Sequence, residues 1–253
     1  MTKKIMLNQT IWIEQRQVAF VYLPKVACTS WKLFFAYALN LTFPENLDYE
    51  QVHHPIIFPL PYVGGMMDEA QERFLLQLES GKIQLYAMVR NPRQRILSAY
   101  LDKIALHCPP GSFFDYNVIP AIQLWAGLDS GQCPSFEQFL GWINTDDSMF
   151  TQDNHWMPMV DLLGLTGFDS ISVQKYSKIW TMEDINVASD HFCQILSVDF
   201  SFPDNQTLGP RHNLTSSVDL IAKYFTPTAE SLFQSHFNAD LDLYENLISQ
   251  RRI

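Results

Sequence analysis

The sequence predicts an α/β fold in which helices cover both faces of a central parallel sheet. Residues 17–23 (QVAFVYL) and 83–89 (IQLYAMV) are short apolar runs rich in aromatic and β-branched side chains, which is typical of buried strands. Each run is followed by a short loop and then by apolar residues at helical spacing, at 31–39 and 93–106. Strands that alternate with helices favour a parallel sheet, because parallel strands need a crossover connection.

Capping residues mark the start of both helices. Thr29 or Ser30 stands in N-cap position before the first helix, and Asn91 followed by Pro92 begins the second. Further helices are expected at residues 135–143, 182–196, 216–225 and 227–246, and a later strand at 173–176. Residues 108–132 contain Pro109, Pro110, Gly111 and Pro120 and are expected to be irregular.

Composition points to one folded domain over residues 1–253. The chain has 17 Lys plus Arg against 27 Asp plus Glu, a net charge of −10, and is 47% hydrophobic. It contains no repeat and no linker rich in Gly and Ser. An acidic total disfavours binding to nucleic acid, which requires a basic face. Residues 1–105 nevertheless carry 11 basic and 9 acidic residues, so an anionic ligand is expected in the first half.

Neither a membrane span nor a metal site is expected. The longest uncharged run, residues 51–67, contains three prolines and two histidines and is unsuited to a transmembrane helix. The basic N-terminus lacks the apolar core and cleavage site of a secretion signal. The four cysteines, at positions 28, 108, 133 and 193, form no CxxC pair, which favours buried thiols in a reducing compartment over disulfides or zinc. A soluble, cytoplasmic protein is the resulting expectation.

The loop between the first strand and helix suits a phosphate or sulfate group. It comprises Pro24, Lys25, Val26, Ala27, Cys28, Thr29 and Ser30. A strand–loop–helix turn directs backbone N–H groups and the positive end of the helix dipole at one point. Lys25 adds a mobile positive charge, and Thr29 and Ser30 add hydroxyl donors. The loop departs from the GxxxxGK[ST] pattern of nucleoside triphosphatases, because it has no glycine and its lysine comes early.

A second set of anion-binding residues follows the second strand. Arg90 ends that strand, and Ser98 lies about two helical turns further on. A guanidinium group can bind a phosphate with two hydrogen bonds, and the serine hydroxyl adds a third donor. A ligand with two separate phosphate groups would satisfy both loops.

Taken together, PKVACTSWK (24–32) and VRNPRQRILSAY (89–100) strongly resemble the two nucleotide signatures of sulfotransferases, in particular those of the carbohydrate, chondroitin 4-O-like group. Residues 153–158 (DNHWMP) and 241–244 (LDLY) look like later segments of that family. The resemblance implies a P-loop-like three-layer fold. It also implies that Lys25 to Ser30 hold the 5′-phosphosulfate of 3′-phosphoadenosine-5′-phosphosulfate (PAPS), and that Arg90 and Ser98 hold the 3′-phosphate.

The sequence departs from the family pattern in three respects. Golgi members of the family carry an N-terminal membrane anchor and luminal cysteines that are missing here, which again favours a cytoplasmic enzyme. The second signature has Asn91 where Asp is common.

The expected reaction is in-line transfer of the sulfuryl group to a hydroxyl without a metal, leaving adenosine 3′,5′-bisphosphate. Lys25 is expected to neutralise the charge that develops on the leaving phosphate. His53 or His54, ahead of His155, is expected to take the proton of the acceptor hydroxyl. Arg211 is a further candidate for contact with the nucleotide.

The acceptor is expected to be a neutral or lightly charged carbohydrate, or a small hydroxylated metabolite. Residues 106–253 carry 6 basic and 18 acidic residues, which disfavours a densely sulfated polymer. Two other functions stay open: a P-loop-like kinase or nucleotide hydrolase, and a non-catalytic nucleotide-binding protein on the same fold. The sequence leaves the oligomeric state undetermined.

Overall fold

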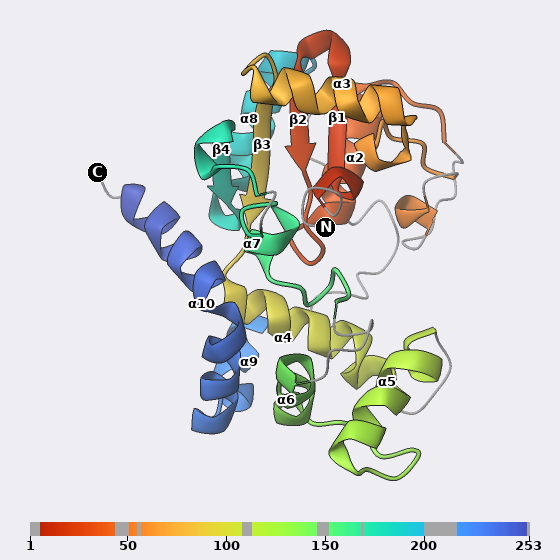
Figure 1. The fold of residues 1–253 in the computed structure, drawn as a ribbon, viewed down its shortest axis with the longest axis vertical. Helices are drawn as coiled ribbons and strands as arrows, with labels where there is room; N and C mark the ends of the chain where they lie inside the picture. Colours follow the sequence, from red (N-terminus) through yellow and green to blue (C-terminus); the bar gives the residue numbers. More distant parts are fainter. Residues whose placement is uncertain are drawn as a thin grey trace. The chain divides into compact units, whose positions relative to one another are not determined.

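A computed structural model describes residues 6–43, 51–54, 57–107, 113–145, 152–167, 170–199 and 217–251 (Figure 1). The chain forms two compact units. The first comprises residues 1–89, 159–212 and 247–253, and the second comprises residues 90–158 and 213–246. The expectation of a single domain stays a prediction.

The first unit contains a four-stranded sheet in the order β1-β2-β3-β4. The strands are β1 (Thr10–Ile13), β2 (Val18–Val21), β3 (Gln84–Val89) and β4 (Tyr176–Thr181). Strands β2, β3 and β4 are parallel, as the alternation of strands and helices predicts, whereas β1 pairs antiparallel with β2. The α/β fold class is therefore confirmed, with one antiparallel edge strand added.

Helices cover both faces of this sheet. On one face, Phe20 of β2 contacts Trp31 and Phe35 of α2 (Cys28–Ala38) and Phe192 of α8 (Ile185–Leu196). On the other face, Trp12 of β1 packs against Phe74 of α3 (Asp68–Glu79) at a ring-centroid distance of 5.3 Å. The short helix α7 (Met159–Leu162) also belongs to this unit. The result is the three-layer arrangement that the resemblance implies.

The second unit is helical within its described residues. It contains α4 (Pro92–Lys103), α5 (Phe113–Ala126), α6 (Phe136–Thr145), α9 (Ser217–Tyr224) and most of α10 (Pro227–Gln250). These elements bury one apolar cluster, whose members include Ile96, Leu97, Tyr100, Ile122, Trp142, Trp156, Phe233 and Phe237. Asn91 caps α4 as predicted, accepting hydrogen bonds from the N–H groups of Arg93 and Gln94 at 3.1 and 3.3 Å.

Three local expectations were wrong. Helix α5 occupies part of the segment 108–132 that was expected to be irregular, and Pro120 lies inside it. Proline removes one helical hydrogen bond, but burial of neighbouring Val118, Ile119 and Ile122 compensates for that loss. Residues 173–175 form a 3-10 turn, capped by the Ser172 hydroxyl, and the strand begins only at residue 176.

The third error concerns the start of α2. The helix begins at Cys28, and its N-cap is Ala27 rather than Thr29 or Ser30. The cap residue makes no side-chain hydrogen bond to the helix. Thr29 and Ser30 therefore lie in the first turn of the helix and not at its cap.

Candidate active site

The loop before α2 holds two non-glycine residues in the left-handed region. Lys25 has φ 66° and Ala27 has φ 51°. This conformation costs an L-residue roughly 1–2 kcal/mol, and such strain is found preferentially at binding and catalytic sites. Between them, Val26 is 1% exposed and donates its N–H to the Leu23 carbonyl at 3.2 Å. Burial of Val26 thus anchors the loop, while Lys25 stays half-buried beside it.

The first turn of α2 has the geometry of an anion site. The Trp31 N–H donates to the Ala27 carbonyl at 3.0 Å. The first N–H groups of a helix have no helical carbonyl one turn earlier to accept their hydrogen bonds. They also form the positive end of the helix dipole. Thr29 and Ser30, 3% and 5% exposed, lie in this turn. Backbone N–H groups, two hydroxyls and a lysine therefore occupy one short stretch, the combination that binds phosphate or sulfate.

His53 contacts α2 directly. It ends the 3-10 turn Gln51–His53, and its ring spans two side chains of the helix. Nε2 lies 3.0 Å from Thr29 Oγ1, and Nδ1 lies 3.1 Å from Lys32 Nζ. Both histidines are exposed, and the backbone carbonyl of His54 accepts from the N–H groups of Ile57 and Phe58. Of these two predicted histidines, the structure thus brings His53 to the first turn of α2.

Lys32 is a functional candidate that the sequence analysis did not identify. Its side chain is 3% exposed, and Nζ lies 4.5 Å from the centroid of the Tyr22 ring and 5.5 Å from that of Tyr62. Burial lowers the pKa of Lys32 to about 8, against the opposing effect of nearby Cys28. Burial also raises the pKa values of Tyr22 and Tyr62 above their usual value. The available signal was a single lysine within the apolar run WKLFFAYAL.

In the second unit, α4 carries a row of buried polar side chains. Arg95, Ser98 and Asp102 are 1%, 3% and 8% exposed, and their spacing of three and four residues places them on one side of the helix. The Arg95 guanidinium donates to the carbonyls of Met157 and Asn154 at 2.8 and 2.9 Å. The predicted phosphate ligand Ser98 therefore lies beside a buried arginine that holds the 153–158 segment. Arg90 is half-buried just before α4.

The third histidine candidate is oriented by a carboxylate. Oδ1 of Asp153 accepts from the backbone N–H of His155 at 2.8 Å and lies 2.6 Å from Nδ1 of the same residue. Burial acts to raise the pKa of Asp153, but its bonds to His155 and the charges of His155 and Lys103 outweigh burial and lower that pKa. The adjacent Trp156 is fully buried against Phe139, which holds the segment in place.

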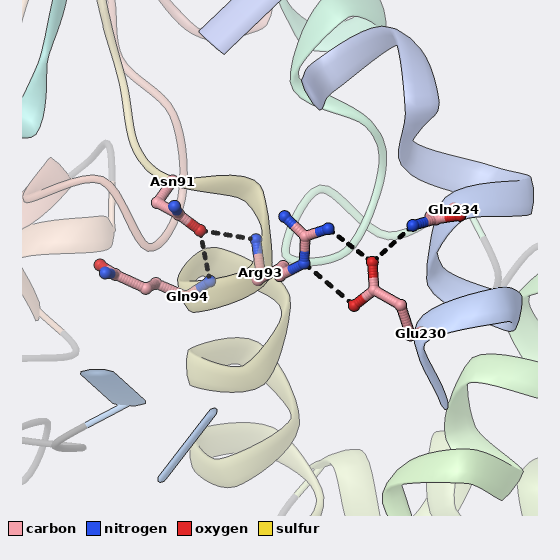
Figure 2. A network of polar contacts seen from close by, with 5 residues as sticks. All are labelled: Asn91, Arg93, Gln94, Glu230 and Gln234. Atoms are coloured by element: carbon pink, nitrogen blue, oxygen red, sulfur yellow. Dashed lines mark hydrogen bonds and ion pairs between the residues drawn. The ribbon is translucent and has the colours of Figure 1, made fainter. Parts of the chain in front are cut away.

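Arg93, also within the second signature, has a structural partner. Figure 2 shows its guanidinium facing the Glu230 carboxylate of α10, with N···O distances of 3.0 and 2.5 Å. Gln234 donates to the same carboxylate at 2.7 Å. Arg93 thereby links α4 to α10. Arg211, a predicted nucleotide contact, lies outside the described residues. Among the residues that the structure describes, no three His, Cys, Asp or Glu side chains gather as a metal site would require.

Comparison with known proteins finds two relatives that agree with the resemblance. They are carbohydrate sulfotransferase 14 of Mus musculus and carbohydrate sulfotransferase 14 of Homo sapiens, each 22% identical to this chain over 161 residues. The aligned part is 63% of this chain and 40% of the length of each relative. No solved structure matches the chain significantly.

These relatives overturn the expected cytoplasmic location. Both are named carbohydrate sulfotransferases, the group whose Golgi members are membrane-anchored, and this group is not cytoplasmic. The unpaired spacing of the cysteines was therefore insufficient ground for that expectation. Separately, none of the described helices is both long and apolar enough to cross a bilayer.

A family model described as "Sulfotransferase family" matches residues 8–244. The match includes both signature loops, all three histidine candidates and the segment around Trp156. It also extends across the helical second unit to α10. The chain belongs to the sulfotransferase family, a family of transferases.

Proposed function

We propose that this transferase moves the sulfuryl group of PAPS to a hydroxyl of a carbohydrate acceptor. One observation carries the proposal. The loop between β2 and α2 holds Lys25 and Ala27 in left-handed conformations at the start of a helix whose first turn buries two hydroxyls. This arrangement supplies N–H donors, O–H donors and a cation at one place, which suits the phosphosulfate end of the donor.

The proposed roles of the side chains follow from charge. As the S–O bond to the phosphate breaks, negative charge develops on the phosphate oxygen, and Lys25 neutralises it. The amides and hydroxyls of the first turn of α2 hold the 5′-phosphate. Arg90 and Ser98 hold the 3′-phosphate, since an arginine and a hydroxyl together can satisfy its oxygens.

Hydrogen bonding favours His155 over His53 as the base. The contact between Nδ1 and Asp153 orients the His155 ring and favours the tautomer in which Nε2 carries a lone pair. Nε2 takes the acceptor's O–H proton while the acceptor oxygen forms its bond to sulfur. In His53, Nδ1 faces the Lys32 ammonium, which only donates, so this ring carries its proton on Nε2.

The acceptor class is proposed from the relatives and from charge. The matching proteins are named carbohydrate sulfotransferases. The acidic balance of residues 106–253 favours a neutral or lightly charged glycan. Transfer of radiolabelled sulfate from PAPS to a panel of neutral, carboxylated and sulfated glycans tests this choice. Preference for the sulfated members would contradict it.

Ligand-dependent thermal stability tests the donor. Adenosine 3′,5′-bisphosphate at 100 times its Kd should add about 2.7 kcal/mol to the free energy of unfolding. ADP, and ATP with Mg²⁺, should add much less. Stabilisation by ATP with Mg²⁺ alone would favour a kinase-like protein, and no response to any of these ligands would refute the proposed donor.

Two variants separate an enzyme from a binding protein. Lys25→Ala should lower kcat by orders of magnitude and weaken bisphosphate binding far less, because its charge acts mainly on the transition state. The exposed Lys82→Ala is the matched control and should change neither quantity. Asp153→Asn should lower kcat with little change in the donor KM, because it disturbs only the orientation of His155. A kcat unaffected by Lys25→Ala would contradict the mechanism.

A further inference from the structure

Three side chains of the first unit form a continuous hydrogen-bonded series. Lys32 Nζ lies 3.1 Å from His53 Nδ1, and His53 Nε2 lies 3.0 Å from Thr29 Oγ1. Lys32 and Thr29 are both 3% exposed and lie on consecutive turns of the same helix, while His53 comes from a separate segment of the chain. The series thus links a buried cation to a hydroxyl in the anion-binding turn.

The chemistry of Lys32 determines which group donates and which accepts in each hydrogen bond of the series. An ammonium group has three donors and no acceptor, so Nδ1 of His53 must present its lone pair to Lys32. In a neutral imidazole the remaining proton is then on Nε2. Nε2–H therefore donates to Thr29 Oγ1, and the proton of the Thr29 hydroxyl stays available for another acceptor.

The surroundings of Lys32 hold it as a cation near neutral pH. Its Nζ lies over the ring of Tyr22 and near that of Tyr62, and aromatic faces attract ammonium groups. Cys28 raises the lysine pKa and thus opposes the effect of burial, and the resulting value of about 8 leaves the ammonium form dominant at pH 7. The side chain is a buried charge in defined contacts rather than a solvated surface lysine.

We propose that Lys32 is a positioning residue that fixes the tautomer of His53 and thereby makes the Thr29 hydroxyl a hydrogen-bond donor to the anionic donor substrate. This inference rests on the proposed function of the β2–α2 loop. In the opposite tautomer, Nε2 would accept the Thr29 proton, and the hydroxyl would present only lone pairs to a phosphate. The charge of Lys32 therefore selects the tautomer in which the turn attracts an anion.

The tautomer is measured directly by NMR of the ligand-free protein. In protein labelled with ¹⁵N-histidine at pH 7, His53 should show a pyridine-like Nδ1 and a pyrrole-like Nε2, with the signals assigned by their loss in His53→Gln. In Lys32→Met the two nitrogen shifts should move toward the averaged values of exposed His54, the internal control. Lys32→Arg, which keeps a donor-only cation, should restore the wild-type pattern.

Two results would overturn the proposal. One is a wild-type His53 that is protonated on Nδ1 or averages between tautomers, a measurement that needs a folded His53→Gln only for assignment of the signals. The other is a folded Lys32→Met protein with an unchanged His53 tautomer. Neither result depends on the identity of the ligand, so the proposal can fail while the proposed function stands.

Binding of adenosine 3′,5′-bisphosphate provides the second readout. Lys32→Met and Thr29→Val should each weaken binding about tenfold, since each removes the same charge-assisted hydrogen bond. The double variant should bind no more weakly than Thr29→Val alone, because Lys32 acts through Thr29. If the two losses of binding free energy were additive, Lys32 would not act through Thr29, and the proposal would be refuted. A wild-type protein that shows the expected tautomer but binds no bisphosphate would instead refute the proposed donor.

Discussion

Replacing Lys32 with methionine should change how stability depends on pH. Lys32 is 3% exposed, and burial lowers the pKa of its ammonium group from 10.5 to about 8. The unfolded chain therefore binds more protons than the folded chain between these two values, so wild-type stability rises with pH in that window. The cost of the buried charge is complete below pH 8 and is relieved as pH approaches 10.5. Lys32→Met has a similar shape and no charge to titrate.

The size of the effect follows from the shift. At about 1.4 kcal/mol per pKa unit, the lowered pKa corresponds to a cost of about 3 kcal/mol at pH 7, falling to about 1 kcal/mol at pH 10. The stability advantage of Lys32→Met over the wild type should thus shrink by about 2 kcal/mol over this range. Any difference in packing energy between lysine and methionine is the same at every pH, so it does not contribute to this change in relative stability. The energy lost with the contacts to Tyr22 and Tyr62 is part of this pH-independent difference.

Urea denaturation at half-unit steps from pH 7 to pH 10 measures the difference. The range stops there because Tyr22 and Tyr62, with raised pKa values, lose their stabilising contribution as pH rises beyond the ordinary tyrosine value of 10.0. Lys82→Met, at an exposed position, should show a pH-independent difference. A Lys32→Met difference that stays constant across the range, or grows with pH, would refute a buried ammonium at this position.

Three further substitutions test separate parts of the structure by denaturation. Gly64→Ala should cost roughly 1–3 kcal/mol, because its Cβ would lie 2.8 Å from the Cα of Asn8, whereas Gly65→Ala meets nothing within 4 Å and should cost far less; equal costs would contradict this close packing of Gly64 on Asn8. Ala27→Gly should stabilise the protein by up to about 1 kcal/mol, since glycine adopts a left-handed conformation without strain, and a loss would argue against the φ of 51°. A double-mutant cycle of Arg93→Met with Glu230→Gln should give a coupling of about 1 kcal/mol that weakens with salt, and a coupling of zero would indicate that the two-fold contact does not persist in solution.

Elements with strong local signals were predicted, and elements with weak local signals were not. Strands β2 and β3 lie within the apolar runs 17–23 and 83–89, and α4 has both a cap and an apolar stripe, so each is evident from its own residues. Strand β1 has four residues and exists through its pairing with β2. Helix α3 buries only Phe74 and Leu78, so its apolar pattern is weak.

The residues of the candidate site also fall into those that the sequence identified and those that only the structure identified. Lys25 and the two hydroxyls were identified because one continuous loop carries them. The contact between Thr29 and His53 joins residues 24 apart in sequence, and the buried state of Lys32 depends on Tyr22 and Tyr62 from other segments. A list of residue types could name His53 as a candidate, but its hydrogen-bond partners decide what it does.

The partner at Nδ1 distinguishes His53 from His155, two candidate bases that the sequence analysis ranked with His53 ahead of His155. In His155 this nitrogen faces the Asp153 carboxylate, which only accepts, so the proton lies on Nδ1 and Nε2 is basic. In His53 it faces the Lys32 ammonium, which only donates, so Nδ1 carries the lone pair and Nε2 donates. Opposite charges at the same ring atom thus select opposite tautomers. A base needs the first arrangement and a group that orients a hydroxyl toward an anion needs the second, so each histidine has the tautomer required by the role proposed for it.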